Sequence, residues 1–587
     1  MFFRLKVSGA RRYLQIVENQ WVDGRACQRV VATVGRLDHL AASGALDALL
    51  ASGARFSEQA VLLSKLTDPD AAPHLGTKRI GAPLIFGRLW EETGCQAVIE
   101  QALSTRGFEF PVERAVFTAV LHRIMVSGSD RACEQWMDDY DIAGTDGLAL
   151  HHFYRAMAWL GEELPEDRQA HATPFAPRTL KDEIEEALFE RGRDLFSDLS
   201  VVFMDTTSLS FTGAGGETLG KRGHSKDHRP DLNQMILAVV IDGDGRPVCS
   251  EMAPGNTADV TVLLPIVDRL RHRFKIGRVC VVADRGMISE ATIAALEERA
   301  LEYVLGVRER IDRRVRDHVL DDPAPFTPLL IERAKGETQL FAKEVRVDDR
   351  RYIICRNEAE AEKDRRDRQA IIEGLEKQVA RGDKALVGNS AYRRYLRKAR
   401  RQGEDGPEET REPVFEIDAG KLADEARYDG VFVLRTNARI SPLQAMLRYR
   451  DLLQVEAVFR TAKALMHTRP IYHSSDAAIR GHVFCSFLAL VLRKALQTRC
   501  EAAGLKPEWG DVLRDLDRLE SATVTSGGKS WTIRTEATGT LPAIIKAVGV
   551  ALPPRARPAE RDPPSAPSPA QPTPKRRGRP RHGATRA

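Results

Sequence analysis

The feature that most constrains the fold is a series of short apolar runs between about residues 195 and 307. Three runs come first, separated by turn residues: LSVVFMDTTSL, MILAVVIDGDG and RPVCSEMAPGN. A helix pattern, a strand, a second helix and a short strand follow: VTVLLPIVDRLRHRF, GRVCVVADRG, SEATIAALEERAL and EYVLGV. Three strands followed by alternating helices and strands predict an α/β domain with a mixed sheet flanked by helices, not a purely parallel sheet.

Two carboxylates stand at the ends of apolar runs in this series. Asp205 ends or interrupts the run VVFMD, and Asp284 ends the run VCVVAD. For either residue alone the ordinary explanation is structural, because an Asp at a strand end commonly caps the following turn or pairs with a nearby cation. Together, the two strands of an α/β sheet would direct both carboxylates toward one end of the fold.

A well-marked helix start follows the last strand candidate, DGVFVLRTN. Ser441 is placed for the N-cap and Pro442 for the first turn. Gln444, three residues after the Ser, completes a capping box. The sequence therefore predicts a helix that begins here and ends before Pro470.

That helix carries a third carboxylate. Tyr449, Glu456 and Lys463 recur every seven residues and so fall on one line of the helix. Glu456 lies at the border of an apolar stripe that contains Val455, Phe459, Ala462 and Met466. Taken alone, it is most simply a Glu whose stem covers apolar surface while its head reaches water.

Asp205, Asp284 and Glu456 together suggest a metal site. Clustered carboxylates raise one another's pKa unless cations compensate for their charge. Ligands that are all oxygen suit Mg²⁺ or Mn²⁺. Two such ions about 3.5–4 Å apart can activate an attacking oxygen and stabilise the leaving one in phosphodiester cleavage. We therefore expect two Mg²⁺ or Mn²⁺ ions at this site.

The order of these features resembles that of a known family. The chain has a strand with an Asp, a second strand with an Asp, an inserted domain and then a helix with a Glu. This order is similar to that in the DDE transposases of bacterial insertion sequences, which have a ribonuclease H-like catalytic domain. The last helix resembles the Tyr–Arg–Glu–Lys motif of one large subgroup, although Leu452 stands where the motif has Arg. Other similar stretches within residues 195–500 are GHSKDHRPDLNQ, MAPGNTAD, DRGM and TRPIYHSSDAAIRGHVFCSFLAL.

The resemblance implies that Asp205, Asp284 and Glu456 are the catalytic triad and bind the metal. It implies a Mg²⁺-dependent enzyme that cuts DNA at the ends of its own element, after which the freed 3′-hydroxyl attacks target DNA. Because two ends must meet, it also implies a homodimer or larger synaptic complex on double-stranded DNA. Two rivals remain: a non-catalytic DNA-binding protein that kept the fold, and a nuclease without strand transfer.

Residues near Glu456 are candidates for DNA contacts. Lys463 would reach a phosphate, and Tyr449 a phosphate or a stacked base. Arg450 and Arg460 are the nearby candidates for the role of the missing motif Arg. The simpler alternatives are a solvated charge for Lys463 and a rim aromatic for Tyr449. The histidines that follow, His467, His473 and His482, are expected to be hydrogen-bonded structural residues.

Seven regions are predicted along the chain. The first two are strand-rich and helical, and the helical one is either a DNA-binding module or a packing domain. An inserted domain separates the two parts of the catalytic domain, and a Pro-rich, basic, disordered tail ends the chain. The predicted bounds are 1–75 (N-terminal β-hairpin region and helix), 76–190 (helical), 191–307 (catalytic, first part), 308–430 (inserted), 431–500 (catalytic, last part), 501–550 (C-terminal segment) and 551–587 (tail).

The tail holds a second DNA-binding candidate. The net charge of the chain is +5, and the last thirteen residues, KRRGRPRHGATRA, carry +6. Arg577-Gly578-Arg579-Pro580 has the core of an AT-hook, in which an extended backbone fits the narrow A·T minor groove and both Arg side chains enter it. The alternative is a generic basic tail that binds any nucleic acid.

The cysteines and the hydrophobic pattern indicate the cellular compartment. Eight cysteines are scattered without a Cys-x-x-Cys pair, which argues against a zinc ribbon or a disulfide framework and for a reducing cytoplasm. The charged, alternating N-terminus does not have the pattern of a secretory signal, and we find no apolar run of about 18 residues that would span a membrane. We therefore expect a cytoplasmic protein without a membrane partner.

Overall fold

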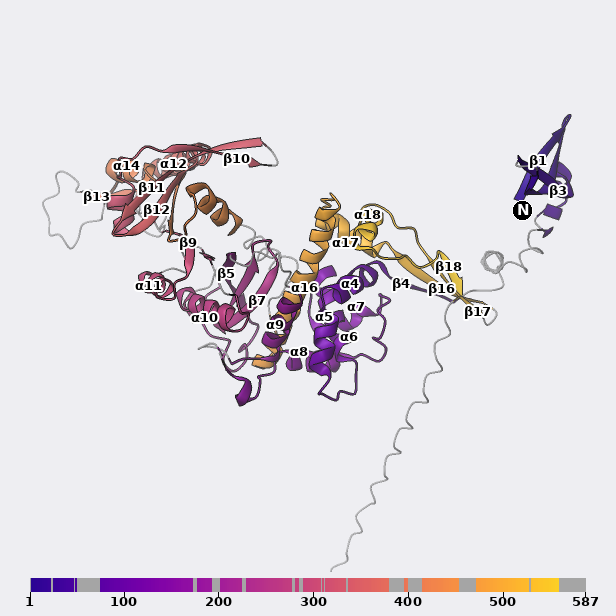
Figure 1. Cartoon of the computed structure of the whole chain (residues 1–587), viewed down its shortest axis with the longest axis horizontal. Coiled ribbons are helices and arrows are strands. Elements are labelled where there is room, and N and C mark those ends of the chain that lie inside the picture. The colour runs from indigo at the N-terminus through magenta and orange to yellow at the C-terminus, as the bar shows by residue number, and fades with distance from the viewer. Residues whose placement is uncertain are drawn as a thin grey trace, which may run out of the picture. The chain divides into compact units, whose positions relative to one another are not determined.

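The computed structural model describes most of the chain in two compact units. The first comprises Met1–Gly81, Arg514–Pro542 and Ala551–Ala587, and the second Ala82–Leu513 and Ala543–Val550. Figure 1 shows the elements of both units. The described residues are 2–22, 25–46, 48–49, 74–170, 172, 177–192, 201–223, 229–276, 280–283, 289–307, 309–310, 312–333, 336–379, 395–399, 414–452, 471–526 and 529–558.

A nine-stranded mixed sheet forms the centre of the second unit, with strand order β10-β11-β12-β15-β9-β8-β5-β6-β7. β5 is parallel to β8, and β8 to β9, whereas the other neighbours are antiparallel. The predicted mixed sheet is confirmed. The strands are β5 (Val201–Ser210), β6 (Gln234–Asp242), β7 (Pro247–Pro254), β8 (Cys280–Ala283), β9 (Glu302–Gly306), β10 (Thr327–Arg333), β11 (Gly336–Val347), β12 (Arg350–Arg356) and β15 (Val431–Thr436).

Helices cover both faces of this sheet, because successive strand residues point to opposite faces and both sets are apolar. On one face, α10 (Asp259–His272) and α11 (Glu290–Glu298) bury their apolar sides against a core that includes Met204 and Val281. On the other face, a core that includes Phe203 and Val282 is completed by the helix of residues 442–452 and by the start of α16 (Asp476–Ala502).

A helical region packs beside the sheet in the same unit. Its central helix, α6, is buried along almost its whole length and contacts α16, as does α8. No helix in the described part of the chain is long and apolar enough to cross a membrane. The helices are α4 (Gly81–Glu92), α5 (Cys95–Leu103), α6 (Val112–Met125), α7 (Asp130–Met137), α8 (Leu150–Leu160), α9 (Leu180–Gly192) and the 3-10 helix η1 (Glu166–Arg168).

The stretch 308–430, predicted as an inserted domain, divides into two parts. Its strands β10, β11 and β12 extend the main sheet beyond β15. A separate small core of Leu375, Tyr395 and Leu396 holds the rest together. The bounds of an inserted domain remain a prediction. Besides the strands, this stretch contains the π-helix η3 (Val315–Val319), α12 (Glu358–Val379), β13 (Leu396–Ala399), β14 (Val414–Ile417) and α14 (Ala419–Ala426).

The first unit contains two small antiparallel sheets. One has the order β1-β2-β3 and is followed by α1, in agreement with the strands predicted at the N-terminus. The other has the order β18-β17-β16-β4. The elements are β1 (Phe2–Ser8), β2 (Arg11–Val22), β3 (Arg25–Arg36), α1 (Leu37–Ala42), β4 (His74–Arg79), β16 (Glu520–Ser526), β17 (Lys529–Arg534) and β18 (Ala556–Pro558); α17 (Trp509–Asp517) and α18 (Leu541–Val548) each cross a unit boundary.

The start of the predicted disordered tail is part of the second of these sheets. β18 lies within the predicted tail, yet it pairs with β17 through Trp531 and Pro558. The Arg534 side chain donates to the carbonyl oxygen of Pro553, which helps to fix this segment. The tail from residue 559 onward, including Arg577 and Arg579, lies outside the described residues.

Candidate functional site

The strand register brings together the positions that precede two predicted catalytic residues. Met204 of β5 pairs with Ala283 of β8, and Ala283 pairs with Leu305 of β9. Asp205 follows Met204 within β5, where its backbone pairs with Val239 of β6. The side chain of Asp205 is outside the description, and Asp284, which follows Ala283, lies outside the described residues.

The helix of residues 442–452 begins as predicted. The Ser441 amide donates to Gln444 Oε1 at 2.9 Å, and the Gln444 amide donates to Ser441 Oγ at 3.2 Å, so the predicted capping box is confirmed. Arg351 of β12 donates to the carbonyl oxygens of Ala438 and Ile440 at 2.9 and 2.8 Å. These bonds fix the start of the helix to the sheet.

The sheet-facing side of this helix is buried. Ala445, Met446 and Leu452 belong to the same core as Phe203 and Val282. Leu452, which stands where the Tyr–Arg–Glu–Lys motif has Arg, is only 5% exposed. A guanidinium buried at that place would lose its water, so the apolar residue suits the position.

Tyr449 packs on the sheet with its ring. The ring stacks on Phe432 of β15, with centroids 6.4 Å apart and planes 19° apart. A Cβ added at Gly306, the last residue of β9, would lie 2.3 Å from Tyr449 Oη. Since Gly306 follows Leu305, Tyr449 Oη lies over the strand level immediately after the row Met204–Ala283–Leu305. The Tyr449 ring therefore packs against β15 and the end of β9.

The cations near this helix have different surroundings. Arg450, predicted to contact DNA, is 40% exposed and lies 3.9 Å from its neighbour Asp451. Arg448, which sequence reasoning missed, reaches the sheet, with Nη1 3.6 Å from Cys280 Sγ of β8. Its signal in the sequence was weak, because a single Arg between Leu447 and Tyr449 does not indicate which strand it contacts. The other predicted residues on this helix, Glu456, Arg460 and Lys463, lie outside the described residues.

The chain after residue 470 returns to the end of β5. The Thr212 amide donates to the Ile471 carbonyl oxygen at 3.0 Å, which continues the sheet by one parallel bridge between Phe211 and Ile471. Asp476 at the start of α16 then accepts from the backbone and hydroxyl of Thr218, and Glu217 accepts from the Asp476 amide. These bonds tie the loop after β5 to the N-terminus of α16.

A buried polar cluster joins α16 to the helical region. Arg123 Nη2 of α6 lies 2.8 Å from His482 Nδ1 of α16 and 3.3 Å from Asp130 Oδ1 of α7. His473 Nε2 lies 3.1 Å from Asp130 Oδ2 and 3.2 Å from His482 Nδ1. His473 and His482 are therefore hydrogen-bonded structural residues, as the sequence led us to expect.

Asp130, His473 and His482 also form the only group in the described part of the chain whose Asp, Glu, His or Cys atoms converge as metal ligands would, within 4.8 Å of one another. Arg123 already supplies a permanent positive charge inside this group. A guanidinium that donates to His482 Nδ1 uses the lone pair that a metal would need. The group therefore does not fit a metal ion.

The protonation states follow from this arrangement. Burial and the charge of Arg123 lower the pKa of His482 to about 4, so this ring is uncharged and can accept from Arg123. Burial alone would raise the pKa of Asp130, but the contacts with His473 and the charge of Arg123 outweigh it and hold that pKa well below its usual range. A neutral His482 between an ionised Asp and Arg stabilises the junction of three helices.

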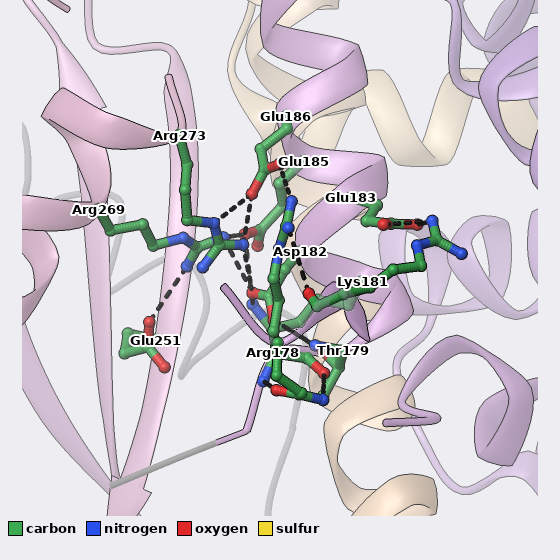
Figure 2. Close-up of polar contacts among 12 residues, drawn as sticks. Arg178, Thr179, Lys181, Asp182, Glu183, Glu185, Glu186, Glu251, Arg269 and Arg273 are labelled. Atoms are coloured by element: carbon green, nitrogen blue, oxygen red, sulfur yellow. Dashed lines mark hydrogen bonds and ion pairs between the residues drawn. The ribbon is translucent and has the colours of Figure 1, made fainter. Parts of the chain in front are cut away.

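A second buried network fixes α9, the helix that precedes β5 (Figure 2). Arg269 Nη2 of α10 lies 2.5 Å from Glu185 Oε2 and 2.9 Å from Asp182 Oδ1, both on α9. Lys181 Nζ lies 2.8 Å from Asp182 Oδ1 and donates to the Ser250 carbonyl oxygen of β7. All four charged side chains are almost fully buried, so ion pairs as well as apolar contacts, such as that of Phe189 with Phe274, hold α9 in place.

Two further carboxylates, Glu251 and Glu186, complete the charge balance of the network. Arg269 Nη1 lies 3.2 Å from Glu251 Oε2 of β7, and burial raises the pKa of Glu251 despite this neighbour. Glu186 accepts from both Arg178 and Arg273. Four cations therefore face four carboxylates: Arg178, Lys181, Arg269 and Arg273, with Asp182, Glu185, Glu186 and Glu251.

Two protein-family models match the chain. The Transposase DDE domain matches residues 196–492, slightly more than half of the chain and the part that contains the β5–β8–β9 row and the 442–452 helix. The IS1634 family transposase N-terminal domain matches residues 4–68. No curated protein matches the chain. The chain therefore belongs to the DDE-domain transposases of insertion sequences.

Proposed function

We propose that this transposase cleaves DNA at the ends of its element and transfers the freed ends to target DNA, with Asp205, Asp284 and Glu456 as the catalytic residues. The observation that carries the proposal is the register of β5 and β8. Met204 and Ala283 are direct partners in a parallel pair, and an aspartate follows each of them in the sequence. Parallel strands keep their later positions level, so both aspartates would reach the same end of the sheet.

The alternation of strand residues supports a common face for these positions. Phe203, Val282 and Val304 belong to the core that the 442–452 helix covers. Positions 205 and 284 each come two residues after a member of that set, and a two-residue step returns to the same face. A helix that continues from Leu452 for one further turn would reach Glu456 beside that face. The ribonuclease H-like description of the domain is part of this proposal.

The three carboxylates would hold Mg²⁺ or Mn²⁺, for which all-oxygen ligand sets are suited. When bound, two such ions supply charge stabilisation at the attacking and the leaving oxygen of a phosphodiester. Water attacks phosphorus and the bond to the 3′ oxygen breaks, which leaves a 3′-hydroxyl and a 5′-phosphate. That hydroxyl then attacks a target phosphodiester, whose own 3′ oxygen leaves.

Several cations would bind the DNA around this site. Arg450, Arg460 and Lys463 would contact phosphates, as Arg and Lys commonly do. Because the ring of Tyr449 packs on Phe432 and Gly306, its DNA contact would come from the hydroxyl and not from base stacking.

In the tail, Arg577 and Arg579 would enter an A·T-rich minor groove. Replacing both by Lys should lower the preference for A·T-rich over G·C-rich duplexes in an equilibrium binding assay. An unchanged preference would leave only a generic basic tail.

The proposed assembly is a homodimer or larger synaptic complex in the cytoplasm. Eight cysteines without a disulfide, seven of them buried, suit a reducing compartment. A non-catalytic DNA-binding protein is the disfavoured alternative, because the chain retains an aspartate after both members of the Met204–Ala283 pair.

The test is metal-dependent nicking of a supercoiled plasmid that carries the element's ends. Asp205→Asn, Asp284→Asn and Glu456→Gln should each abolish nicking in Mg²⁺ or Mn²⁺ while DNA affinity changes by no more than about threefold. Asp244→Asn, an exposed acid in the turn between β6 and β7, is the matched control and should keep full activity. Nicking by Glu456→Gln at the unmodified rate would remove Glu456 from the site.

A further inference from the structure

The N-terminal sheet concentrates positive charge. Residues 1–36 contain seven Lys or Arg and two Asp or Glu, a net charge of +5. The last thirteen residues carry +6, so residues 37–574, which contain the whole matched DDE domain, have a net charge of −6. A polyanion would therefore meet its strongest attraction at the two ends of the chain and not over its middle.

The cations of this sheet gather at one end of the β1–β2 hairpin. Ser8 pairs with Arg11, so Gly9 and Ala10 form a two-residue loop, in which Gly9 supplies the positive φ of 60° that such loops need. Lys6, Arg11 and Arg12 flank this loop and are exposed. None of the three forms an ion pair with any described residue, so their charges are available to an external anion.

An aromatic residue lies between two of the cationic positions. Lys6 pairs with Tyr13 across β1 and β2, and Tyr13 pairs with Arg36 across β2 and β3. The three side chains therefore form one row across the sheet, with Arg36 held by Asp38. Arg11 lies on the same face as this row, two residues before Tyr13, whereas Arg12 pairs with Val7 and lies on the opposite face of the hairpin. The row with Arg11 is suited to a phosphate backbone, since cations bind phosphate and a Tyr hydroxyl can donate to it, and Arg12 would reach a phosphate on the other side of the hairpin.

We propose that this end of the sheet, formed by Lys6, Arg11, Arg12, Tyr13 and Arg36, is a second DNA-binding surface of the transposase, which contacts the phosphate backbone of duplex DNA. The proposed function supplies the choice of DNA as the polyanion; the surface itself is outside the DDE domain. A two-stranded β-ribbon fits the major groove, where the flanking phosphates lie within reach of its cations.

The rival occupant is a second copy of the chain. Phe3, Leu5 and Val7 on the edge strand β1 are about half exposed or more, as an interface would need. However, antiparallel self-pairing of β1 centred on Leu5 would set Arg4 opposite Lys6 of the other copy, and like charges directly opposite are destabilising. The charge pattern therefore favours a polyanion over self-association through β1.

The test uses the full chain and a random 30-base-pair duplex, with the dissociation constant measured by fluorescence anisotropy over a range of salt. The triple variant Lys6→Gln, Arg11→Gln, Arg12→Gln should lower the slope of log K against log salt by about 2–3, since each phosphate contact contributes about 0.9. The matched control, Lys363→Gln, Arg366→Gln, Lys377→Gln, removes the same charge from exposed positions on α12 and should leave the slope within about 0.5.

Three further readouts make the result decisive. Arg11→Lys with Arg12→Lys keeps the charge and should keep the slope, so a lower slope in the triple variant reports the lost charge and not substitution at these positions as such. Equal slopes for the two triple variants, or a shift in oligomeric state by sedimentation without a change in slope, would overturn the proposal. The triple variant should still nick DNA at saturating protein concentration, so a failed surface and a failed active site give different results.

Discussion

Met204 of β5 and Ala283 of β8 are direct partners in a parallel strand pair, and each is followed in the sequence by an aspartate. Each strand supplies only one of these aspartates, so a site needs both. The short strand β8, four residues long, is held beside β5 by its place between β5 and β9. The helix of residues 442–452 packs over the strand level just after this row, where Tyr449 lies against Gly306. The proposed chemistry thus depends on how the strands and this helix fit together.

The contact between Gly306 and Tyr449 gives the first prediction. Gly306→Ala places a Cβ 2.3 Å from Tyr449 Oη, so either the ring or the helix must move. We expect an overpacking cost of about 1–3 kcal/mol in urea unfolding and a loss of nicking larger than the loss of stability explains. Adding Tyr449→Phe, which removes the nearest atom, should restore part of both.

Gly87→Ala is the control for that experiment, because a Cβ at Gly87 in α4 meets no atom within 4 Å. It should be neutral or slightly stabilising, since Ala favours a helix by up to about 1 kcal/mol over Gly. If Gly306→Ala is equally harmless, the helix does not rest on the end of β9 as described.

The buried charge network of α9 gives the second prediction. Arg269→Met leaves Asp182, Glu185 and Glu251 without their shared cation in a buried site. Removing one partner from a buried charged group typically costs about 3–5 kcal/mol, and we expect a loss of that size in urea unfolding. Arg271→Met, an exposed position on the same helix, should cost less than about 1 kcal/mol. Similar losses for both variants would contradict the account of α9.

The third prediction concerns pH. The pKa of His482 and that of His122 are both lowered to about 4 by burial and the charge of Arg123, whereas an unfolded His titrates near 6.5. A lowered folded pKa gives stability that is present above about pH 6.5 and lost as the pH falls toward 4. The free energy of unfolding should therefore fall between about pH 7 and pH 4.5.

Substitution identifies the source of that dependence. His482→Asn keeps an acceptor for Arg123 but cannot titrate, so the fall in stability below neutral pH should become shallower. His318→Asn, an exposed histidine in η3, is the control and should follow the unmodified protein at every pH. A pH profile that is identical in all three proteins would show that His482 does not carry the effect.

Local patterns in the sequence predicted the parts of the fold that local rules decide. The mixed sheet followed from short apolar runs and the helix start from Ser441 and Gln444, because strand length and capping depend on neighbouring residues. The addition of β10–β12 to the sheet was not predicted, since strand pairing between distant segments leaves little trace in a single sequence.

The buried polar groups also depend on contacts between distant parts of the chain, which the sequence does not reveal. Lys181, Asp182 and Glu185 look like a solvated helix face in sequence, and only the approach of Arg269 makes them an interior network. Likewise Arg123 and His482 are far apart in sequence and meet only through the packing of α6 on α16. Tyr449 was expected at a rim or on DNA, yet its ring is part of the packing against β15.

The most direct test of the central claim is iron-directed cleavage of the protein backbone. Fe²⁺ that replaces Mg²⁺ generates hydroxyl radicals in the presence of ascorbate and peroxide, and these cut peptide bonds close to the metal ligands. We predict cuts near residues 205, 284 and 456 together, suppressed by excess Mg²⁺ and lost from all three places in Asp205→Asn. Cuts that spare one of the three positions, or that fall instead beside Asp130 and His473, would contradict it.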